Sequence, residues 1–194
     1  MQKLAATQLM SLEQYARERA TLRPGMIEHR RARQLRIGEH CSWSFEDRRT
    51  VHYQVQEMLR SERIFEPDAI AEELATYNPL IPDGSNLKAT LMIEYPEPEE
   101  RARRLGELRG FERHWGMRVA GFDPVYAIAD EDLVRENEVK TSAVHFLRFE
   151  FLGPMIQAAK AGAALAAGTD HPRYRYSVDP LPDGLRLALL ADFA

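Results

Sequence analysis

The chain has 194 residues, of which 44% are hydrophobic, and its formal net charge is −4. This length and apolar fraction suffice for one well-buried core, so we expect a single domain spanning residues 1–194. The acidic balance argues against general nucleic-acid binding. The single cysteine, Cys41, excludes an intrachain disulfide and any cysteine cluster that would hold zinc or an iron–sulphur centre.

No stretch of the sequence approaches the roughly 18 consecutive apolar residues of a membrane-spanning helix. The N-terminal segment also lacks the apolar run that is typical of a signal peptide. We therefore expect a cytoplasmic protein with no membrane contact.

Residues 1–33 predict a basic helical hairpin. Ser11, followed by a glutamine three residues later, matches the capping box, so one helix is expected to begin there and end near Ala20. Pro24 suits the first turn of a second helix that ends near Arg33. Basic side chains outnumber acidic ones in this segment, which would suit RNA or an acidic partner protein. Because the chain as a whole is acidic, we favour a solvated hairpin that packs near the acidic remainder.

Residues 34–194 predict a body of sheet and helices. Alternating hydrophobicity predicts a β-hairpin at 34–46 and strands at 87–95, 115–120, 125–129, 142–152 and 173–178. Helical spacing predicts helices at 48–64, 67–77, 97–109, 154–167 and 185–193, and residues 131–140 predict a polar helix or loop. The elements follow no regular βαβ rhythm. We therefore predict an α+β fold with a single, mostly antiparallel and strongly curved sheet packed with helices.

The helix at 48–64 carries the first candidate site residues. Asp47 can cap it, because a carboxylate accepts hydrogen bonds from the free amides of the first turn. Glu57, Arg60 and Arg63 lie away from the apolar stripe of this helix. They form either a solvated face with a weak ion pair or the lining of a cleft. Arginine favours the second interpretation, because its guanidinium binds carboxylate or phosphate in a fixed bidentate geometry.

Two predicted strands carry the remaining charges. Lys88 and Glu94 lie on one side of the first strand, and Arg148 and Glu150 lie on one side of the second. We expect the strands to be neighbours, with these charges on a common inner face roofed by the helix at 48–64. Buried charges are costly unless they are paired or bound, so such a face predicts an ionic network or a ligand.

Two residues with reactive side chains are interpreted as core residues. Cys41 lies on the apolar face of the hairpin with Trp43 and Phe45, and no pattern around it indicates a lowered pKa. His145 falls on the apolar side of its strand, where a hydrogen-bonded core histidine is more common than a metal ligand. The spacing of histidines and carboxylates matches no familiar metal motif.

The segments FEDRRTVHYQVQEMLRSERIFE (45–66), YNPLIPDGSNLKATLMIEYP (77–96) and Glu138–Glu150 resemble a bacterial family, domain of unknown function 3501. The resemblance covers nearly the whole chain, and Val139 departs from the pattern of the third segment. Members of this family have no established activity. Genes for rubrerythrin-like and iron–sulphur oxidoreductase proteins often accompany theirs, which implies a role near redox or peroxide metabolism.

We expect first a protein that binds a small anionic ligand carrying a carboxylate or phosphate. Cationic side chains would hold the anion, namely Arg60, Arg63, Lys88 and Arg148. Carboxylates would orient it or accept a proton, namely Glu57, Glu94 and Glu150.

A second hypothesis is a non-catalytic partner of a rubrerythrin-like or iron–sulphur oxidoreductase, with the charged residues forming a structural network. The third is a metal-dependent redox protein in which carboxylates and imidazole suit iron or manganese. Its ligands would be Glu57, Glu94, His145 and Glu150. The sequence does not determine whether the protein is an enzyme. It also does not identify a cofactor or the oligomeric state.

Overall fold

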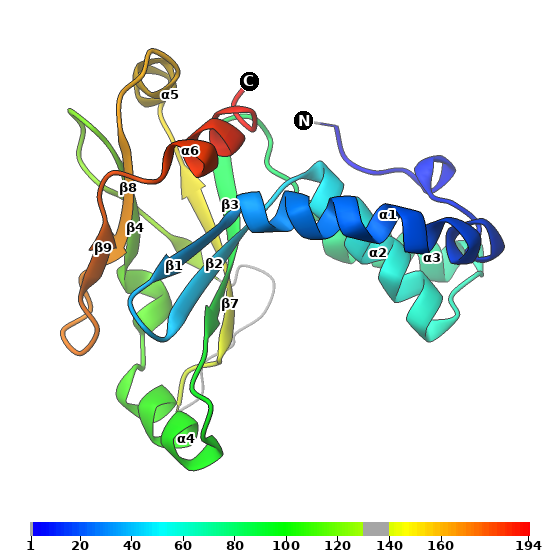
Figure 1. Ribbon diagram of the computed structural model, residues 1–194, viewed down its shortest axis with the longest axis horizontal. Helices are drawn as coiled ribbons and strands as arrows, with labels where there is room; N and C mark the ends of the chain where they lie inside the picture. Colours follow the sequence, from blue (N-terminus) through cyan, green and yellow to red (C-terminus); the bar gives the residue numbers. More distant parts are fainter. Residues whose placement is uncertain (1, 130–139) are drawn as a thin grey trace.

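A computed structural model describes residues 2–129 and 140–194. The chain folds as an α+β protein, as its pattern of elements predicts (Figure 1). Its strands do not share one sheet, however. They form a five-stranded sheet, here sheet A, with strand order β1-β2-β3-β7-β6, and a four-stranded sheet, sheet B, with order β5-β4-β8-β9.

Sheet A is antiparallel throughout. Its strands are β1 (Gln34–Ile37), β2 (Cys41–Glu46), β3 (Asn86–Ile93), β7 (Val144–Glu150) and β6 (Ile128–Ala129). The predicted hairpin is confirmed as β1 and β2, and the predicted pairing of the two charged strands is confirmed as β3 and β7. The hairpin forms because Cys41, Trp43 and Phe45 alternate with polar residues and all three are buried.

Sheet B is also antiparallel. Its strands are β4 (Trp115–Val119), β5 (Val125–Tyr126), β8 (Leu165–Thr169) and β9 (Tyr176–Val178).

The prediction of one helix over residues 154–167 is wrong. Helix α5 (Gly153–Lys160) stops early, and Gly162 follows with a φ of 107°. The remaining residues form β8, because pairing with β4 and burial of Leu165 and Ala167 outweigh the helix propensity of alanine.

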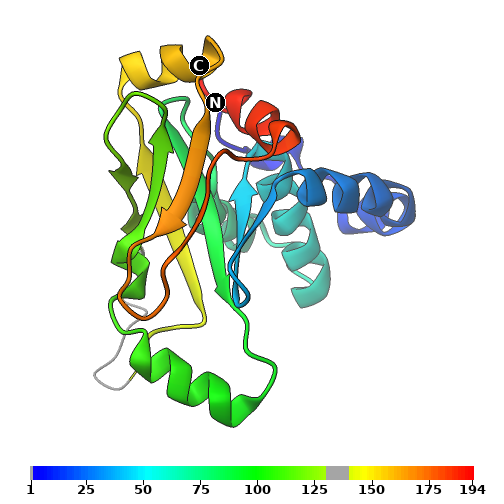
Figure 2. The ribbon, with the colours of Figure 1, turned by 60° about the vertical axis from the view of Figure 1, so that its left-hand side comes forward.

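The main core lies between the two sheets (Figure 2). Trp43 of sheet A meets Trp115 of sheet B with ring centroids 5.3 Å apart, and Phe149 lies 5.1 Å from Trp43. Three helices add apolar side chains to this core, namely α4 (Pro98–Glu107), α5 and α6 (Asp183–Leu190). Short 3₁₀ turns lie at Ala6–Gln8 (η1), Asn78–Leu80 (η2) and Phe111–His114 (η3).

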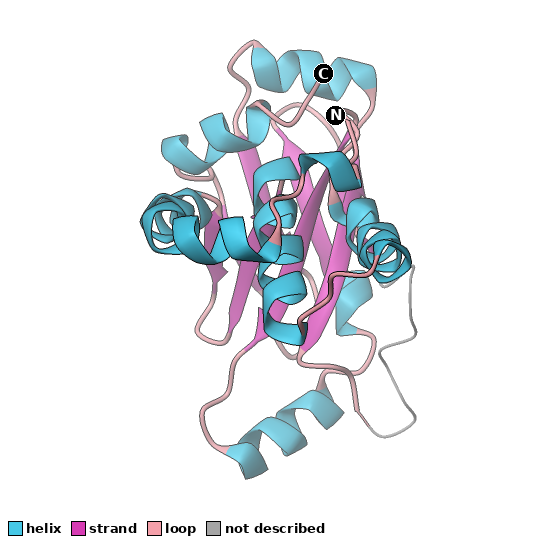
Figure 3. Ribbon diagram, turned by 90° about the vertical axis from the view of Figure 1, so that its right-hand side faces the viewer, coloured by secondary structure: helices cyan, strands magenta, loops and turns pink. Residues whose placement is uncertain are grey.

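Three helices form an arm that projects from sheet A and has a core of its own. They are α1 (Leu12–Ala32), α2 (Arg48–Glu62) and α3 (Pro67–Tyr77). Val51, Val55 and Leu59 of α2 pack there with Leu74 of α3. Figure 3 shows these helices in front of the strands of sheet A. None of the helices in the described residues combines the length and hydrophobicity needed to cross a bilayer.

The predicted N-terminal hairpin is wrong, because α1 is a single helix that runs through Pro24. A proline inside a helix removes one backbone hydrogen bond and costs about 3 kcal/mol. Contacts on both sides of Pro24 offset this cost. Tyr15 and Met26 are buried, and Arg49 Nη2 donates to the carbonyl oxygen of Gly25 at 3.3 Å. The predicted element at 131–140 falls almost wholly outside the described residues.

We predict that Gly168→Ala destabilises the protein by about 1–3 kcal/mol. A Cβ at this position would lie 2.6 Å from the carbonyl oxygen of Tyr176 and 2.9 Å from the Cβ of Ser177, so β9 would have to move. The control is Gly153→Ala, since a Cβ there meets nothing within 4 Å. Urea denaturation of both variants checks the prediction, and equal midpoints would contradict it.

Candidate functional site

A small pocket lies on the outer face of sheet A, where four strands contribute one residue each to a row. Glu46 of β2 pairs with Lys88 of β3, Lys88 with Arg148 of β7, and Arg148 with Ile128 of β6. The pocket has a volume of about 80 Å³. Its other wall comes from the end of α3 and from η2, namely Thr76, Pro79 and Leu80. Two of the predicted site residues, Lys88 and Arg148, therefore meet in one pocket.

Neighbouring oxygens hold both cations in place. Lys88 Nζ donates to the carbonyl oxygen of Pro79, and Arg148 Nη1 donates to the carboxylate of Glu150. Glu150 also accepts a hydrogen bond of 2.9 Å from Asn86 Nδ2. Glu150 thus positions Arg148, which agrees with the expectation that these two residues share one side of the strand.

Glu46 is a pocket residue that the sequence interpretation missed. Its carboxylate accepts hydrogen bonds from the hydroxyls of Thr50 at 2.6 Å and Thr90 at 2.8 Å. The alternation of the hairpin could have indicated this residue, because Glu46 directly follows the buried Phe45 and so points to the other face of the sheet. The predicted common face of the charges is confirmed, but it is the outer face of the sheet. The inner face is apolar, since it forms the aromatic core.

The predicted roof over the pocket is wrong. Glu57 of α2 faces α1, where it accepts hydrogen bonds from Tyr15 Oη at 2.7 Å and from Arg19 Nε at 2.7 Å. These donors, Arg19 above all, hold the pKa of Glu57 at about 2. Arg60 Nε lies 3.8 Å from Glu57, and Arg63 ends α2 in the left-handed conformation. Glu57 therefore links α2 to α1, and Arg19 of α1 neutralises its charge.

Glu94 lies beyond the other end of β3. Its carboxylate accepts from Ser42 Oγ at 3.1 Å, and it lines a separate, open surface with His40 and Tyr95. Six residues of extended chain separate Glu94 from Lys88, or roughly 20 Å. Strand β3 was expected to bring the charges of Lys88 and Glu94 into one site, but it separates them along its length.

The four residues of the metal hypothesis also lie apart. Glu57 is in the arm, while Glu94 and Glu150 lie near opposite ends of sheet A. His145 is fully buried, with its Nε2 2.9 Å from Thr141 Oγ1 and 3.0 Å from the carbonyl oxygen of Ser142. Within residues 2–129 and 140–194, no group of three or more histidine, cysteine, aspartate or glutamate side chains is placed to hold a metal ion.

Two interpretations of core residues are confirmed. His145 is a buried histidine with hydrogen-bond partners, as predicted from its place on the apolar side of the strand. Cys41 is fully buried, and burial raises the pKa of its thiol to about 12. A thiol of that pKa is not a nucleophile at neutral pH.

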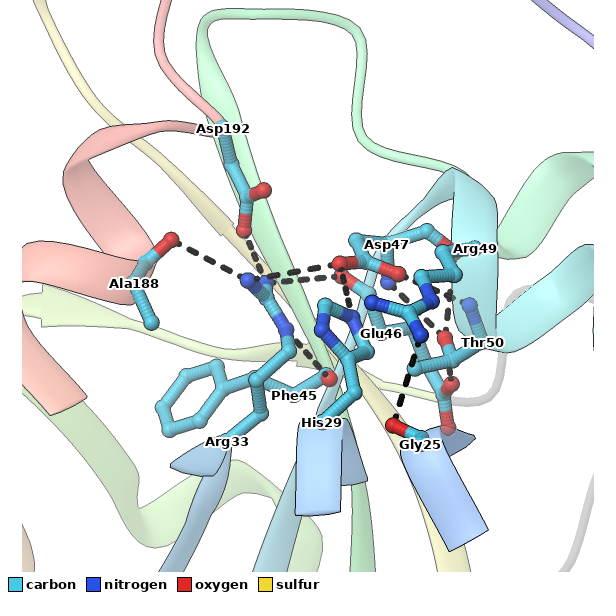
Figure 4. Close-up of polar contacts among 10 residues, drawn as sticks. All are labelled: Gly25, His29, Arg33, Phe45, Glu46, Asp47, Arg49, Thr50, Ala188 and Asp192. Atoms are coloured by element: carbon cyan, nitrogen blue, oxygen red, sulfur yellow. Dashed lines mark hydrogen bonds and ion pairs between the residues drawn. The ribbon is translucent and has the colours of Figure 1, made fainter. Parts of the chain in front are cut away.

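A buried arginine that the sequence did not single out connects the arm to the sheets (Figure 4). Arg33, 3% exposed, directly follows α1. Its Nε donates to the carbonyl oxygen of Phe45 at 3.1 Å, its Nη1 donates to that of Ala188 at 3.0 Å, and its Nη2 donates to the carboxylate of Asp192. Two segments far apart in the sequence, β2 and the C-terminal residues 188–192, thus meet at one guanidinium.

Asp47 extends this cluster toward the arm. Its Oδ2 lies 3.5 Å from Arg33 Nη1 and 2.6 Å from His29 Nε2. Its Oδ1 accepts from the backbone amide of Thr50 at 2.7 Å, which confirms Asp47 as the N-cap of α2. One carboxylate therefore begins a helix and also neutralises a buried cation.

The fold and the site define an α+β protein with two open antiparallel sheets, a helical arm and a charged pocket beneath the arm. A family model described as "Protein of unknown function (DUF3501)" matches residues 3–193, and the chain belongs to this family. The resemblance drawn from the sequence is thereby confirmed.

The chain is similar to a novel protein of unknown function from Burkholderia pseudomallei K96243, known from a crystal structure at 1.90 Å resolution. The two are 45% identical, the match covers 100% of both chains, and the TM-score is 0.94. No curated protein matches the chain.

We predict that Asp192→Asn changes how stability depends on pH. Burial raises the pKa of Asp192 to about 6 in the folded protein, although Arg33 opposes the shift. Unfolding therefore releases a proton between about pH 4 and pH 6. The contribution of this group to stability falls as the pH rises over that range. The loss is on the order of 1–3 kcal/mol.

Urea unfolding between pH 4 and pH 7 tests this prediction, because the difference between the wild type and Asp192→Asn isolates the group. The control, Asp183→Asn, removes an exposed carboxylate from the first turn of α6, the helix that precedes Asp192. Parallel curves for the wild type and Asp192→Asn would contradict the prediction.

Proposed function

We propose that the protein binds a small anion, a carboxylate or a phosphate, in the pocket between Lys88 and Arg148. The observation that carries the proposal is the register of β3 and β7, which places these two cations directly opposite each other in the pocket. An anion placed between two such cations is attracted to both of them. It also gains charge-assisted hydrogen bonds from both side chains.

The surroundings of the pocket support this proposal. The Pro79 carbonyl and the Glu150 carboxylate fix the directions of Lys88 and Arg148, which lowers the entropy lost when an anion binds. Glu46 lines the same pocket and accepts hydrogen bonds only. A ligand oxygen that carries a proton, as in monohydrogen phosphate, would suit the side next to Glu46.

The size of the pocket narrows the ligand. Its volume of about 80 Å³ is well below the roughly 300–1,000 Å³ of pockets that enclose a drug-sized molecule. It therefore suits a carboxylate or phosphate head group, with the rest of the molecule extending past Leu80 and Ile128 at the pocket wall.

We predict that Arg148→Met and Lys88→Met each weaken binding of inorganic phosphate or of small dicarboxylates about tenfold or more, since each removes a charge-assisted hydrogen bond. The control is Arg60→Met, because Arg60 lies in the arm beside Glu57. Isothermal titration calorimetry measures all three variants.

Equal loss of binding in Arg60→Met would contradict this assignment of the site. The absence of binding by every phosphate and carboxylate tested with the wild type would overturn the proposed function itself.

A second candidate function is contact with an oxidoreductase partner protein, as the family resemblance implies. The arm carries an apolar groove of about 330 Å³ lined by Leu9, Leu12, Ile64 and Phe65 among others. Phe65 is 68% exposed. Exposed apolar surface of this kind is typical of sites that contact other proteins.

We predict that Phe65→Asp abolishes binding of a rubrerythrin-like protein from the same organism, measured by calorimetry. The matched control is Leu152→Asp, because Leu152 is also 68% exposed but precedes α5, away from the arm. Failure of the wild-type protein to bind, or equal effects of the two variants, would count against this candidate.

A further inference from the structure

A groove of about 290 Å³ lies on the outer face of sheet B. Its floor crosses two neighbouring strands at Gly116 of β4 and Gly168 of β8, which are register partners, and continues at Ala166. These residues have no side chain beyond a methyl group. A flat group can therefore lie close to the backbone of the sheet at Gly116 and Ala166, while β9 lies over Gly168.

The fold requires one of these two glycines but not the other. Gly168 is required by the fold, because a Cβ there would lie 2.6 Å from the Tyr176 carbonyl oxygen of the adjacent strand. A Cβ at Gly116 would meet the Val125 carbonyl oxygen at 3.4 Å and the Tyr126 ring at 3.6 Å, which are ordinary contacts. Glycine inside a strand weakens it and often marks the close approach of a ligand. Packing among the described residues therefore does not require a glycine at position 116.

An oriented histidine lies at one end of the groove. His114 Nδ1 is 2.7 Å from Asp170 Oδ1, and Tyr126 Oη donates to Asp170 Oδ2 at 2.9 Å. The hydrogen bond from His114 lowers the pKa of Asp170, so this carboxylate is ionised and accepts from both neighbours. The proton of a neutral imidazole is thereby fixed on Nδ1, and Nε2 is left as an acceptor.

A cation lies at the other end of the groove. Arg118 Nη2 donates to Asp179 Oδ2 at 2.5 Å. A guanidinium has five donors, and those that remain on Arg118 make no further hydrogen bond to the described residues. Arg118 is therefore able to bind a second carboxylate while Asp179 keeps it in place.

We propose that this groove is a binding site for a small aromatic hydroxy acid. The carboxylate of the ligand binds Arg118, its ring lies over Gly116 and Ala166 beside Tyr126, and its hydroxyl donates to His114 Nε2. The backbone positions of His114 and Arg118 are roughly 13 Å apart along the strand. Two side chains that reach toward each other across this span leave room for one ring. The site shares no residue with the anion pocket of sheet A.

The test uses 4-hydroxybenzoate as the probe and follows backbone amide signals by NMR. We expect the probe to shift the signals of Gly116, Tyr126 and Gly168. Benzoate, which lacks the hydroxyl, and phenol, which lacks the carboxylate, are each expected to bind more weakly. Arg118→Met should weaken 4-hydroxybenzoate about tenfold or more, the factor expected for a lost charge-assisted hydrogen bond.

Gly116→Val should abolish binding because it fills the floor of the groove, and Lys88→Met serves as the control in the other pocket. If Gly116→Val fails to fold, Arg118→Met and the comparison of the three probes test the proposed site instead. Binding that survives both groove variants, or that Lys88→Met removes, would overturn the proposal.

Two further outcomes would also overturn it. One is the absence of any shift with the wild-type protein. The other is a shift of the same signals on dilution without probe, which would show that a second copy of the chain covers this face.

Discussion

The structure depends on the buried guanidinium of Arg33. Burying a charge is costly unless it is paired and its donors are satisfied, and Arg33 meets this condition only when two distant segments converge. The carbonyl of Phe45 and the carboxylate of Asp47 come from one segment, where β2 ends and α2 begins, and the carbonyl of Ala188 comes from α6. The arm, sheet A and the C-terminal segment are thus fixed relative to one another by one side chain. Without it, the carboxylate of Asp192 would be buried without a counterion.

The same cluster extends to the pocket. Asp47, beside Arg33, accepts from the amide of Thr50, and the hydroxyl of Thr50 donates to Glu46. Glu46 also accepts from Thr90 and lines the pocket with the two cations. A continuous polar network therefore leads from the buried arginine to the candidate site. Because the arm supplies the second wall of the pocket, this network also sets how the wall is placed above the sheet.

Local patterns in the sequence predicted those features that local interactions determine. Alternation predicted that Cys41 faces the core, Asp47 was predicted to cap α2, and the pattern of charge predicted that the strands of Lys88 and Arg148 are neighbours. Features set by tertiary contacts were not predictable in this way. The alanine-rich residues before Thr169 form a strand only because β4 pairs with them. Pro24 lies within a helix only because both of its flanks are packed, and Arg33 is buried by partners from distant segments.

The division of the strands into two sheets explains where the two candidate sites lie. The inner faces meet through Trp43, Trp115 and Phe149, which fill the space that a single curved sheet would have left for a ligand. Charges expected on an inner face therefore appear on an outer one, where solvent and the arm accommodate them. Each sheet consequently presents its own polar surface, one beside Arg148 and the other beside Arg118. The two candidate sites differ in shape but have one physical cause, an aromatic core that fills the interior between the sheets of the described residues.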